Sequence, residues 1–311
     1  EARELRDEVN QNKKYGLFFK EHTAEFSDGG KAHENPDALF AYISENIEKR
    51  GVSAVVIDTR HSVYSKVLPR LYPFALSGVS FFDIERMYED IFDRVPLSLI
   101  GENWFVENVS SARPKVMYDA FKRVFDIVIG GILGIISLVF YPFVCLAIKL
   151  DDHGSVFIVQ ERIGKNCQPV RITKFRSMSG NDGGNYTNGQ SKNTITRVGR
   201  FLRNTRIDEL PQLWDVVLGK LSLIGPRPEL PALVSVYEKD IPYYAVRHLI
   251  TPGLSGWAQI YHDAHPHHQV ATEDTADKLS YDLFYIKNRS ILLDLKIALR
   301  TLQILMMRTG R

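Results

Sequence analysis

The residues of this chain best suited to chemistry are two adjacent carboxylates, Asp208 and Glu209, inside a strongly basic stretch. Adjacent carboxylates repel each other unless a metal ion or nearby cations relieve the repulsion. Cations are present on both sides, because Arg203 and Arg206 come just before the pair and Arg227 follows it. Since guanidinium groups bind phosphate oxygens, the arrangement favours phosphoryl chemistry over a purely structural role.

The element expected to position the pair is a short helix. Asp208 suits its N-cap, Pro211 is tolerated in a first turn, and Gly219 suits its end. Between them apolar residues recur at helical spacing, namely Leu213, Trp214, Val217 and Leu218. The positive end of the helix dipole would keep both carboxylates ionised. The simpler interpretation, an ordinary capped helix on a basic surface, stays open.

A long apolar run, Ile127–Ile148, predicts a membrane segment. It has 22 residues and no charge, and a straight helix of that length would be about 33 Å long, enough to cross a bilayer core. Pro142 interrupts the run and predicts a bend. Basic residues flank both ends, which marks both as cytoplasmic, so we expect a re-entrant helix hairpin over about 122–150. The G-x-x-x-G spacing of Gly130 and Gly134 either admits a second helix or has no packing role.

Upstream, short strands alternate with helices, which predicts a small doubly wound α/β domain, Rossmann-like, over residues 15–113. A charged helical lead-in, 1–14, precedes it, and residues 101–115 form a linker. No G-x-G-x-x-G motif is present in the sequence, so no dinucleotide is inferred and a regulatory or docking role is favoured. The expected strands are Tyr15–Phe19, Val52–Asp58 and Val79–Ile84, and the expected helices begin at Pro36, Val63 and Glu85.

Composition is that of a globular protein with room for two domains. Of 311 residues, 44% are hydrophobic and 24% charged, and the net charge of +2 indicates no particular partner. Two distant cysteines form no disulfide or zinc pattern. The histidines His262, His265, His267 and His268 are interpreted as a loop, since no supporting ligand pattern accompanies them. The helix Ser290–Arg308 is amphipathic and either packs on the core or lies at the membrane surface.

From Lys122 onward, ordered motifs spanning about 190 residues resemble one family. They are KRxxD (Lys122, Arg123, Asp126), IKLDDHG, QERIG, KFRSM, TRVGRFLR, IDELPQLWD, LSLIGPRPE, TPGLSGWAQ and YDLFYI. Together they resemble the bacterial polyprenyl-phosphate phosphoglycosyl transferases, or bacterial sugar transferases, which begin exopolysaccharide and O-antigen glycans. Residues 15–110 resemble, less sharply, the Rossmann-like domain of the large members of that family.

The resemblance implies a role for each matching residue. Asp208 would be the nucleophile, and Glu209 would hold Mg²⁺ against the diphosphate of a UDP-sugar. This agrees with the preference of Mg²⁺ for oxygen ligands. The residues implied to bind substrate phosphates or to complete the active site are Lys174, Arg176, Arg203, Arg227, Arg247 and Asp282.

The chain departs from the usual pattern of the family at three places. Tyr141 precedes Pro142 at the expected bend, where a small residue is usual, so the bend is expected to be stabilised differently. Asp215 stands where Asn is usual, and Lys220-Leu221 replaces an acidic residue followed by Met. Neither of the last two changes touches the implied chemistry.

The resemblance implies a mostly α, membrane-embedded catalytic domain, 114–311, on the cytoplasmic face of the bacterial inner membrane. It would transfer a sugar 1-phosphate from a UDP-sugar to polyprenyl (undecaprenyl) phosphate, releasing UMP, through a covalent aspartyl phosphosugar. The alternative is a non-catalytic membrane scaffold that docks glycan-assembly partners. No nucleic-acid partner is expected, because aromatics do not interleave the arginines. The sugar and the oligomeric state, a homo-oligomer included, stay open.

Overall fold

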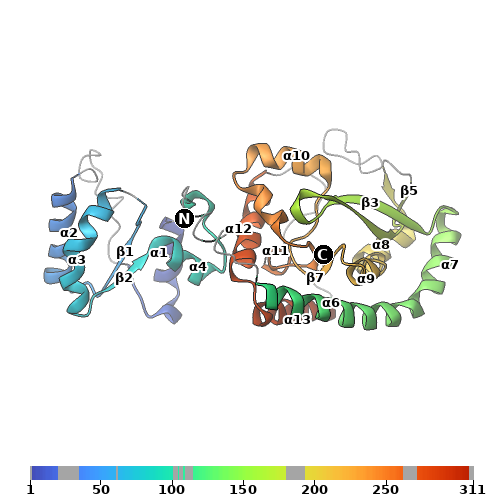
Figure 1. The fold of residues 1–311 in the computed structure, drawn as a ribbon, viewed down its shortest axis with the longest axis horizontal. Coiled ribbons are helices and arrows are strands. Elements are labelled where there is room, and N and C mark those ends of the chain that lie inside the picture. The colour runs from blue at the N-terminus through green and yellow to red at the C-terminus, as the bar shows by residue number, and fades with distance from the viewer. Residues whose placement is uncertain are drawn as a thin grey trace. The chain divides into compact units, whose positions relative to one another are not determined.

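The structure, a computed structural model, describes residues 2–19, 35–60, 62–100, 104, 108, 115–179, 193–261 and 272–307. The chain forms two compact units, Glu1–Phe105 and Val106–Arg311 (Figure 1). The expected histidine loop over 262–268 lies outside the described residues.

The first unit is a mixed α/β unit whose two strands are parallel. Strand alternation explains its layers: Val55 and Ile57 pack against helices α2 and α3, whereas Val56 packs against α1 and α4. Helices therefore cover both faces of the strand pair, as in α/β architecture. The elements are α1 (Ala2–Gln11), η1 (Lys13–Tyr15), α2 (Pro36–Arg50), β1 (Ala54–Ile57), α3 (Ser62–Leu76), β2 (Ser80–Asp83), α4 (Ile84–Phe92) and η3 (Leu97–Leu99).

The expected strand over Tyr15–Phe19 is wrong. Tyr15 ends a 3₁₀ turn, and the residues after it have no regular secondary structure. The Asn10 side chain occupies both main-chain groups of Phe19, accepting from its N–H at 2.6 Å and donating to its carbonyl at 3.1 Å. A neighbouring strand would need those same groups, so the local apolar pattern was not enough to predict a strand here.

In the second unit the apolar run is one long, broken helix. It comprises α6 (Val116–Ser137), the 3₁₀ turn η5 (Leu138–Phe140) and α7 (Tyr141–Asp152), and Figure 1 shows the chain turning between α6 and α7. Pro142 lies in the first turn of α7, where its ring and missing N–H break the helical ladder and cause the bend. The Tyr141 ring packs edge-on against Phe175, with centroids 4.9 Å apart. The bend is thus stabilised by an aromatic contact with the protein.

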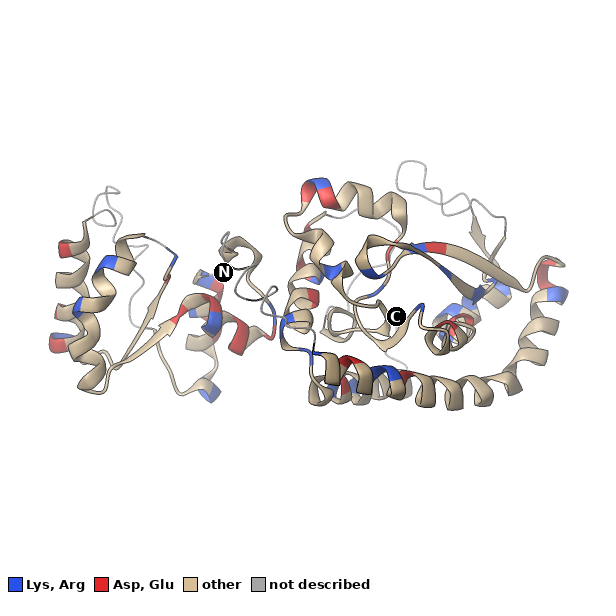
Figure 2. Ribbon diagram, in the orientation of Figure 1, with Lys and Arg blue, Asp and Glu red and all other residues tan. Residues whose placement is uncertain are grey.

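This helix, 37 residues from Val116 to Asp152, is by length and composition the one in the described ranges that could cross a membrane. Figure 2 shows that charged residues lie near its two ends and not between them. Many of its large apolar side chains are exposed. So are those along the final helix, α13 (Ile291–Met306), although Ile297 of that helix is buried. Exposed examples are Met117, Phe121, Val124, Val139, Phe143, Leu146, Leu292, Leu299 and Met306.

Small residues on α6 let α9 (Gln212–Val217) pack closely against it. A Cβ on Gly130 would lie 3.1 Å from Val216 Cγ1, and one on Gly134 would lie 3.4 Å from the Trp214 ring. The G-x-x-x-G spacing therefore does admit another helix, although that helix belongs to the same unit.

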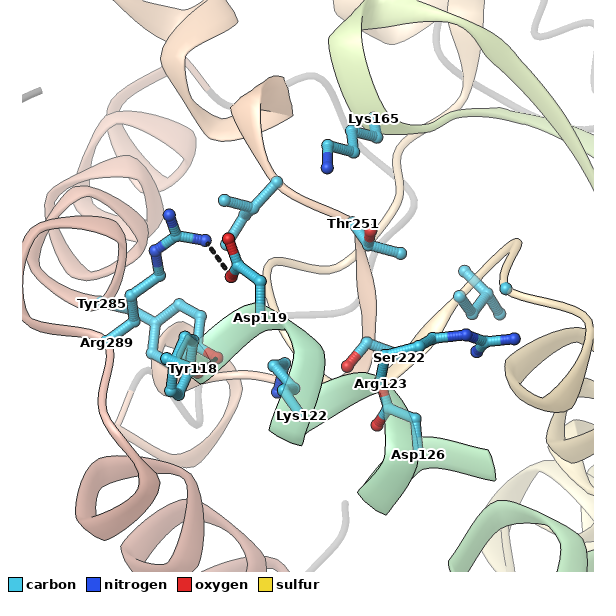
Figure 3. Close-up of a pocket in the computed structure, with 13 residues that line it drawn as sticks. Tyr118, Asp119, Lys122, Arg123, Asp126, Lys165, Ser222, Thr251, Tyr285 and Arg289 are labelled. Atoms are coloured by element: carbon cyan, nitrogen blue, oxygen red, sulfur yellow. Dashed lines mark hydrogen bonds and ion pairs between the residues drawn. The ribbon is translucent and has the colours of Figure 1, made fainter. Parts of the chain in front are cut away.

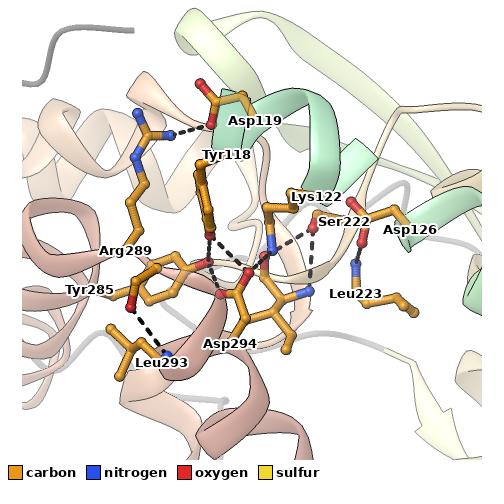
Figure 4. Close-up of polar contacts among 12 residues, drawn as sticks. Tyr118, Asp119, Lys122, Asp126, Ser222, Leu223, Tyr285, Arg289, Leu293 and Asp294 are labelled. Carbon is orange, nitrogen blue, oxygen red and sulfur yellow. Dashed lines mark hydrogen bonds and ion pairs between the residues drawn. The ribbon is translucent and has the colours of Figure 1, made fainter. Parts of the chain in front are cut away.

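The KRxxD motif ties the start of α6 to three other elements. Arg123 donates to the carbonyls of Val216 and Val217 at 2.7 and 2.6 Å. Asp126 accepts from the N–H of Leu223 at 3.0 Å, and Lys122 pairs with Asp294 of α13 at 2.8 Å (Figure 4). The sequence suggested Lys122 and Arg123 as the basic flank that marks the cytoplasmic side of the membrane segment. Both residues therefore also have structural partners.

Asp294 is the meeting point of α6, α12 (Thr272–Asn288) and α13. Its carboxylate accepts from the hydroxyls of Tyr118 and Tyr285 at 2.8 and 2.7 Å, in addition to the Lys122 ammonium (Figure 4). Three donors from two helices satisfy this partly buried carboxylate, so the network fixes α13 against the core.

The remaining elements are short, and the unit is mostly helical with small sheets, as expected for this region. β3 and β4 form an antiparallel hairpin, β5 and β6 a short antiparallel pair, and β7 and β8 a parallel pair. Their bounds are β3 (Phe157–Ile163), η6 (Lys165–Cys167), β4 (Pro169–Phe175), β5 (Met178–Ser179), β6 (Thr194–Ile195), α8 (Arg197–Asn204), η7 (Ile207–Glu209), β7 (Ser222–Ile224), α10 (Pro231–Asp240), η8 (Tyr244–Leu249), β8 (Gly253–Ser255) and α11 (Trp257–Tyr261).

Candidate active site

The acidic pair lies in the 3₁₀ turn η7 and not at the N-cap of a helix. Arg206, whose left-handed backbone (φ 56°) starts the turn, occupies the cap position of η7, and Pro211 occupies that of α9. The predicted N-cap role of Asp208 is therefore wrong, because the chain coils one turn earlier than the apolar pattern indicated. Asp208 is 8% exposed, so the turn holds its carboxylate inside the protein.

Glu209 faces two cations from other elements. Its Oε1 accepts from Arg227 Nη2 at 2.7 Å and lies 3.5 Å from Lys174 Nζ. Burial favours the neutral acid, but Arg227 and Lys174 outweigh it and hold the pKa of Glu209 well below its usual range. Glu209 is therefore a carboxylate at any pH near neutrality, and Oε1 is the oxygen that the cations hold.

Asp208 behaves in the opposite way. Burial, followed by repulsion from Glu209, raises the pKa of Asp208 to about 6, although Lys174, Arg203 and Arg227 oppose the shift. No described residue forms a hydrogen bond with its side chain. The site thus contains two adjacent carboxylates with pKa values pushed apart, which is typical of groups that perform chemistry.

Three elements far apart in sequence deliver the cations. Lys174 comes from β4, Arg203 from the last turn of α8, where it donates to Met178 Sδ at 3.3 Å, and Arg227 from the loop after β7. Close packing of glycines positions that loop: a Cβ on Gly253 would lie 2.1 Å from the main-chain N of Gly225. Side chains larger than hydrogen at Gly253 are therefore excluded, which explains the TPG and IGP motifs.

Arg247 and Asp282 form a buried ion pair that contacts the main chain of Arg227 and not the acidic pair. Their side chains are 4% and 2% exposed, and Arg247 Nη2 lies 2.8 Å from Asp282 Oδ2. The same guanidinium donates to Tyr244 Oη at 2.6 Å and to the main-chain carbonyl of Arg227 at 3.1 Å. Both residues thus support the loop that carries Arg227.

Arg176 is not brought to the acidic pair. Its guanidinium pairs with Asp152 at the end of α7 and donates to the carbonyl of Met178 at 3.1 Å. It also covers Gly154, where a Cβ would overlap it. Its position ties the end of α7 to the β4–β5 segment.

Two residues near the site were not singled out by the sequence. Arg162 of β3 donates to the Pro228 carbonyl at 3.3 Å. Burial and the positive charge of Arg227 lower the pKa of Lys174, and the charge of Arg162 lowers it further. Glu229 lies 3.8 Å from Arg247. Glu229 could have been found as the acid that ends the GPRPE motif, but Arg162 needed knowledge of how β3 packs.

Two of the three departures from the family pattern, Asp215 and Lys220, contact each other. Asp215, buried on α9, pairs with Lys220 Nζ at 2.8 Å, and its other oxygen accepts from the Thr173 N–H at 2.8 Å. Thr173 precedes Lys174 on β4, so this carboxylate also fixes the strand that carries a site cation.

Lys220→Met is expected to lower the free energy of unfolding by about 2 kcal/mol, because it leaves the buried Asp215 carboxylate without its cation. Adding Asp215→Asn, which keeps the acceptor for Thr173, is expected to restore most of the loss. Urea unfolding of the two single variants and the double variant measures this coupling. Additive losses would show that the pair does not interact.

Mg²⁺ requires oxygen ligands, which the acidic pair could supply. Within the described ranges no cluster of three or more His, Cys, Asp or Glu side chains that could hold a metal is present. Mg²⁺ is, however, commonly bound by one or two carboxylates together with substrate phosphates. Glu209 Oε2, to which no described residue donates, and the adjacent Asp208 carboxylate fit that mode.

The candidate site lies inside a region that is similar to known proteins. Residues 117–308 match the family model described as "Bacterial sugar transferase". The chain is 36% identical over 258 residues to a UDP-N-acetylgalactosamine-undecaprenyl-phosphate N-acetylgalactosaminephosphotransferase of Aeromonas hydrophila, covering 80% of this chain and 58% of that protein. It is 36% identical over 185 residues to a UDP-glucose:undecaprenyl-phosphate glucose-1-phosphate transferase of Escherichia coli (strain K12), covering 58% and 39%.

A third relative is similar in length to the matched region. It is the exopolysaccharide production protein PSS of Rhizobium leguminosarum bv. phaseoli, 37% identical over 186 residues, which cover 58% of this chain and 92% of that protein. The chain spans only about half the length of the two longer relatives. Because the family model matches well over half of the sequence and includes the whole candidate site, this chain belongs to the bacterial sugar transferase family.

Proposed function

We propose that the chain transfers a sugar 1-phosphate from a UDP-sugar to undecaprenyl phosphate, the first step in building a bacterial polysaccharide. The observation that carries this proposal is the buried Asp208 carboxylate, which has no hydrogen-bond donor among the described residues and lies in the field of three cations, Lys174, Arg203 and Arg227. The names of the relatives from Aeromonas and Escherichia support the substrate class.

Asp208 is the proposed nucleophile. Its Oδ attacks the phosphorus bonded to the sugar, the bond from that phosphorus to the bridging oxygen breaks, and UMP leaves with the bridging oxygen. An oxygen of undecaprenyl phosphate then attacks the same phosphorus, freeing Asp208 and giving undecaprenyl diphosphate sugar. Two successive displacements let the soluble donor and the lipid acceptor bind at different times.

The cations and Glu209 have separate proposed roles. Arg203, Arg227 and Lys174 hold the diphosphate and reduce its repulsion toward the incoming carboxylate. Glu209 would hold Mg²⁺, which would supply positive charge to the phosphate that leaves as UMP. Arg247 and Asp282 keep the Arg227 loop in place, while Arg176 is more remote and the weakest of the substrate-binding assignments.

We further propose that the Val116–Asp152 helix is a re-entrant membrane hairpin and that the first unit is a Rossmann-like domain. The broken helix supports the hairpin, because α6 packs on α9 while Val144 and Ile148 of α7 pack on Phe175 and Leu202. Both arms thus contact the same compact unit, which supports a catalytic unit on one side of the membrane, and the basic residues that flank both ends support the cytoplasmic face of the inner membrane. The parallel strands covered by helices on both faces support the Rossmann-like assignment of the first unit.

Cysteines placed at the two ends of the hairpin, Met117→Cys and Ser155→Cys, are expected to react from the same side of the membrane. The native Cys145 and Cys167 are first replaced by Ser. Both positions chosen for the new cysteines are exposed. A membrane-impermeant maleimide should label neither site in intact cells and both after lysis. Labelling of one site alone in intact cells would mean that the helix spans the membrane.

The pH dependence of kcat/KM should reveal Asp208. Since the nucleophile must be ionised and its pKa is about 6, kcat/KM is expected to rise with pH through about 6 and to fall below it. Arg203→Gln removes a cation that lowers this pKa, so the acid limb should move to higher pH. Arg203→Lys keeps the charge and should leave the limb in place even though the rate falls. A limb unmoved by Arg203→Gln would assign it to Asp282, whose pKa burial also raises to about 6.

The proposed activity is tested by UMP release from a panel of UDP-sugars in the presence of undecaprenyl phosphate. Release that requires both the lipid and a particular UDP-sugar would support the proposal and identify the sugar. Absence of release with every member of the panel would contradict it and favour a non-catalytic scaffold.

A further inference from the structure

A cavity of about 260 Å³ lies beside the first turns of α6 (Figure 3). It shares no lining residue with the acidic pair or the cations that face it. Its walls come from α6, the β3–β4 turn, the segment around Ser222, the residues before β8 and the end of α12. It is therefore separate from the candidate active site and has its own set of polar side chains.

Most of the charged side chains around this cavity are cationic. The lining includes Lys122, Arg123, Lys165 and Arg289, against two carboxylates, Asp119 and Asp126. Two groups just outside add one charge of each sign: Lys115, whose Nζ donates to the Arg289 carbonyl at 2.8 Å, and Asp294, which pairs with Lys122. Five cations and three carboxylates leave a formal charge of +2.

Part of this positive charge has no anionic partner. The guanidinium of Arg123 is held by two neutral carbonyls, and Arg289, though paired with Asp119 at 3.0 Å, has a buried Nε without a hydrogen-bond partner. The exposed Lys165 ammonium has no ion-pair partner in the described part of the chain, and Figure 3 shows it opposite α6. Thr251 adds a hydroxyl to the lining, whereas the Ser222 hydroxyl donates to the Ile224 carbonyl at 3.0 Å.

We propose that this cavity binds the phosphate group of an organic phosphate. Guanidinium and ammonium groups from three segments, together with the Thr251 hydroxyl, provide the hydrogen bonds that phosphate oxygens accept. The volume suits a phosphate with a few attached carbons and not a whole nucleotide sugar. The outer face of the same α6 turns exposes Met117, Phe121 and Val124, so a lipid headgroup is one source and a soluble phosphoester the other. The proposal does not depend on the transferase reaction.

The test is native mass spectrometry of the full chain in a neutral detergent, titrated with dioctanoyl phosphatidic acid, dioctanoylglycerol and glycerol 3-phosphate. We expect binding that requires the phosphate group. Lys165→Glu should weaken it about fivefold or more, as loss of one charge-assisted contact predicts, whereas Lys165→Arg should retain it. Lys239→Glu, on the exposed part of α10, is the matched control and should have no effect.

The arms distinguish the two sources. Binding of phosphatidic acid but not of glycerol 3-phosphate assigns a lipid headgroup, and comparable binding of both assigns a soluble phosphoester. Equal binding of phosphatidic acid and dioctanoylglycerol would overturn the proposal, as would unchanged affinity in Lys165→Glu. An equal loss in Arg203→Gln would also overturn it, because the phosphate would then occupy the Asp208 site.

Discussion

Asp208→Asn is expected to abolish sugar 1-phosphate transfer, with a loss of about 10⁴-fold or more in kcat. An amide is not a nucleophile at neutral pH, whereas its volume matches that of the carboxylate. Because no described residue forms a hydrogen bond with the Asp208 side chain, the substitution should leave the fold intact. The variant should therefore show the same melting temperature as the parent while releasing no UMP.

The covalent step gives this prediction a second readout. Parent protein incubated with its UDP-sugar in the absence of lipid should gain the mass of one phosphosugar, and Asp208→Asn should gain none. Asp240→Asn, an exposed carboxylate at the end of α10, is the matched control and should form the adduct normally. If no adduct forms with a sugar that turns over, and kinetics require both substrates to be bound together, transfer is direct and Asp208 acts as a base or metal ligand.

Local patterns predicted much of the fold. The uncharged run and Pro142 indicated a long helix that breaks, because helix length and proline sterics are properties of the segment itself. Alternating strands and helices likewise indicated a mixed α/β first unit. The failures occurred where a distant or neighbouring group decides the conformation. Asn10 takes the main-chain groups of Phe19 from nine residues away, and the left-handed Arg206 starts a turn before the expected helix.

The candidate site was partly visible because Asp208, Glu209 and Arg203 lie within one short stretch. What the sequence could not show is how Lys174 reaches Glu209, which requires β4 to pack beside η7. The same holds for the pairing of Arg247 with Asp282, which joins η8 to α12. Residue types and spacing can suggest the chemistry, but contacts between separate elements decide which cations meet which carboxylate.

Glu209→Gln is expected to reduce kcat by about 10²- to 10³-fold and to weaken activation by Mg²⁺ about tenfold or more. Glutamine keeps the shape of the side chain and an oxygen that Arg227 can bind, but it removes the charge that Arg227 and Lys174 now share and the proposed carboxylate ligand. The measurement is the initial rate of UMP release as a function of Mg²⁺ concentration.

Arg227→Lys is the control that separates the two roles of Glu209. Lysine keeps a cation beside Glu209 but loses the guanidinium fork, so kcat/KM should fall while the Mg²⁺ concentration for half-activation stays unchanged. If Glu209→Gln lowers the rate but leaves that concentration unchanged, Glu209 only anchors the cations and the proposed metal ligand is wrong. If both variants raise the Mg²⁺ concentration for half-activation equally, the metal is instead held through the diphosphate that Arg227 positions. Glu209 is identified as the metal ligand only if the Mg²⁺ concentration for half-activation rises in Glu209→Gln and not in Arg227→Lys. Of the two substitutions, Glu209→Gln is the one that removes a carboxylate and leaves the proposed phosphate-binding cations in place.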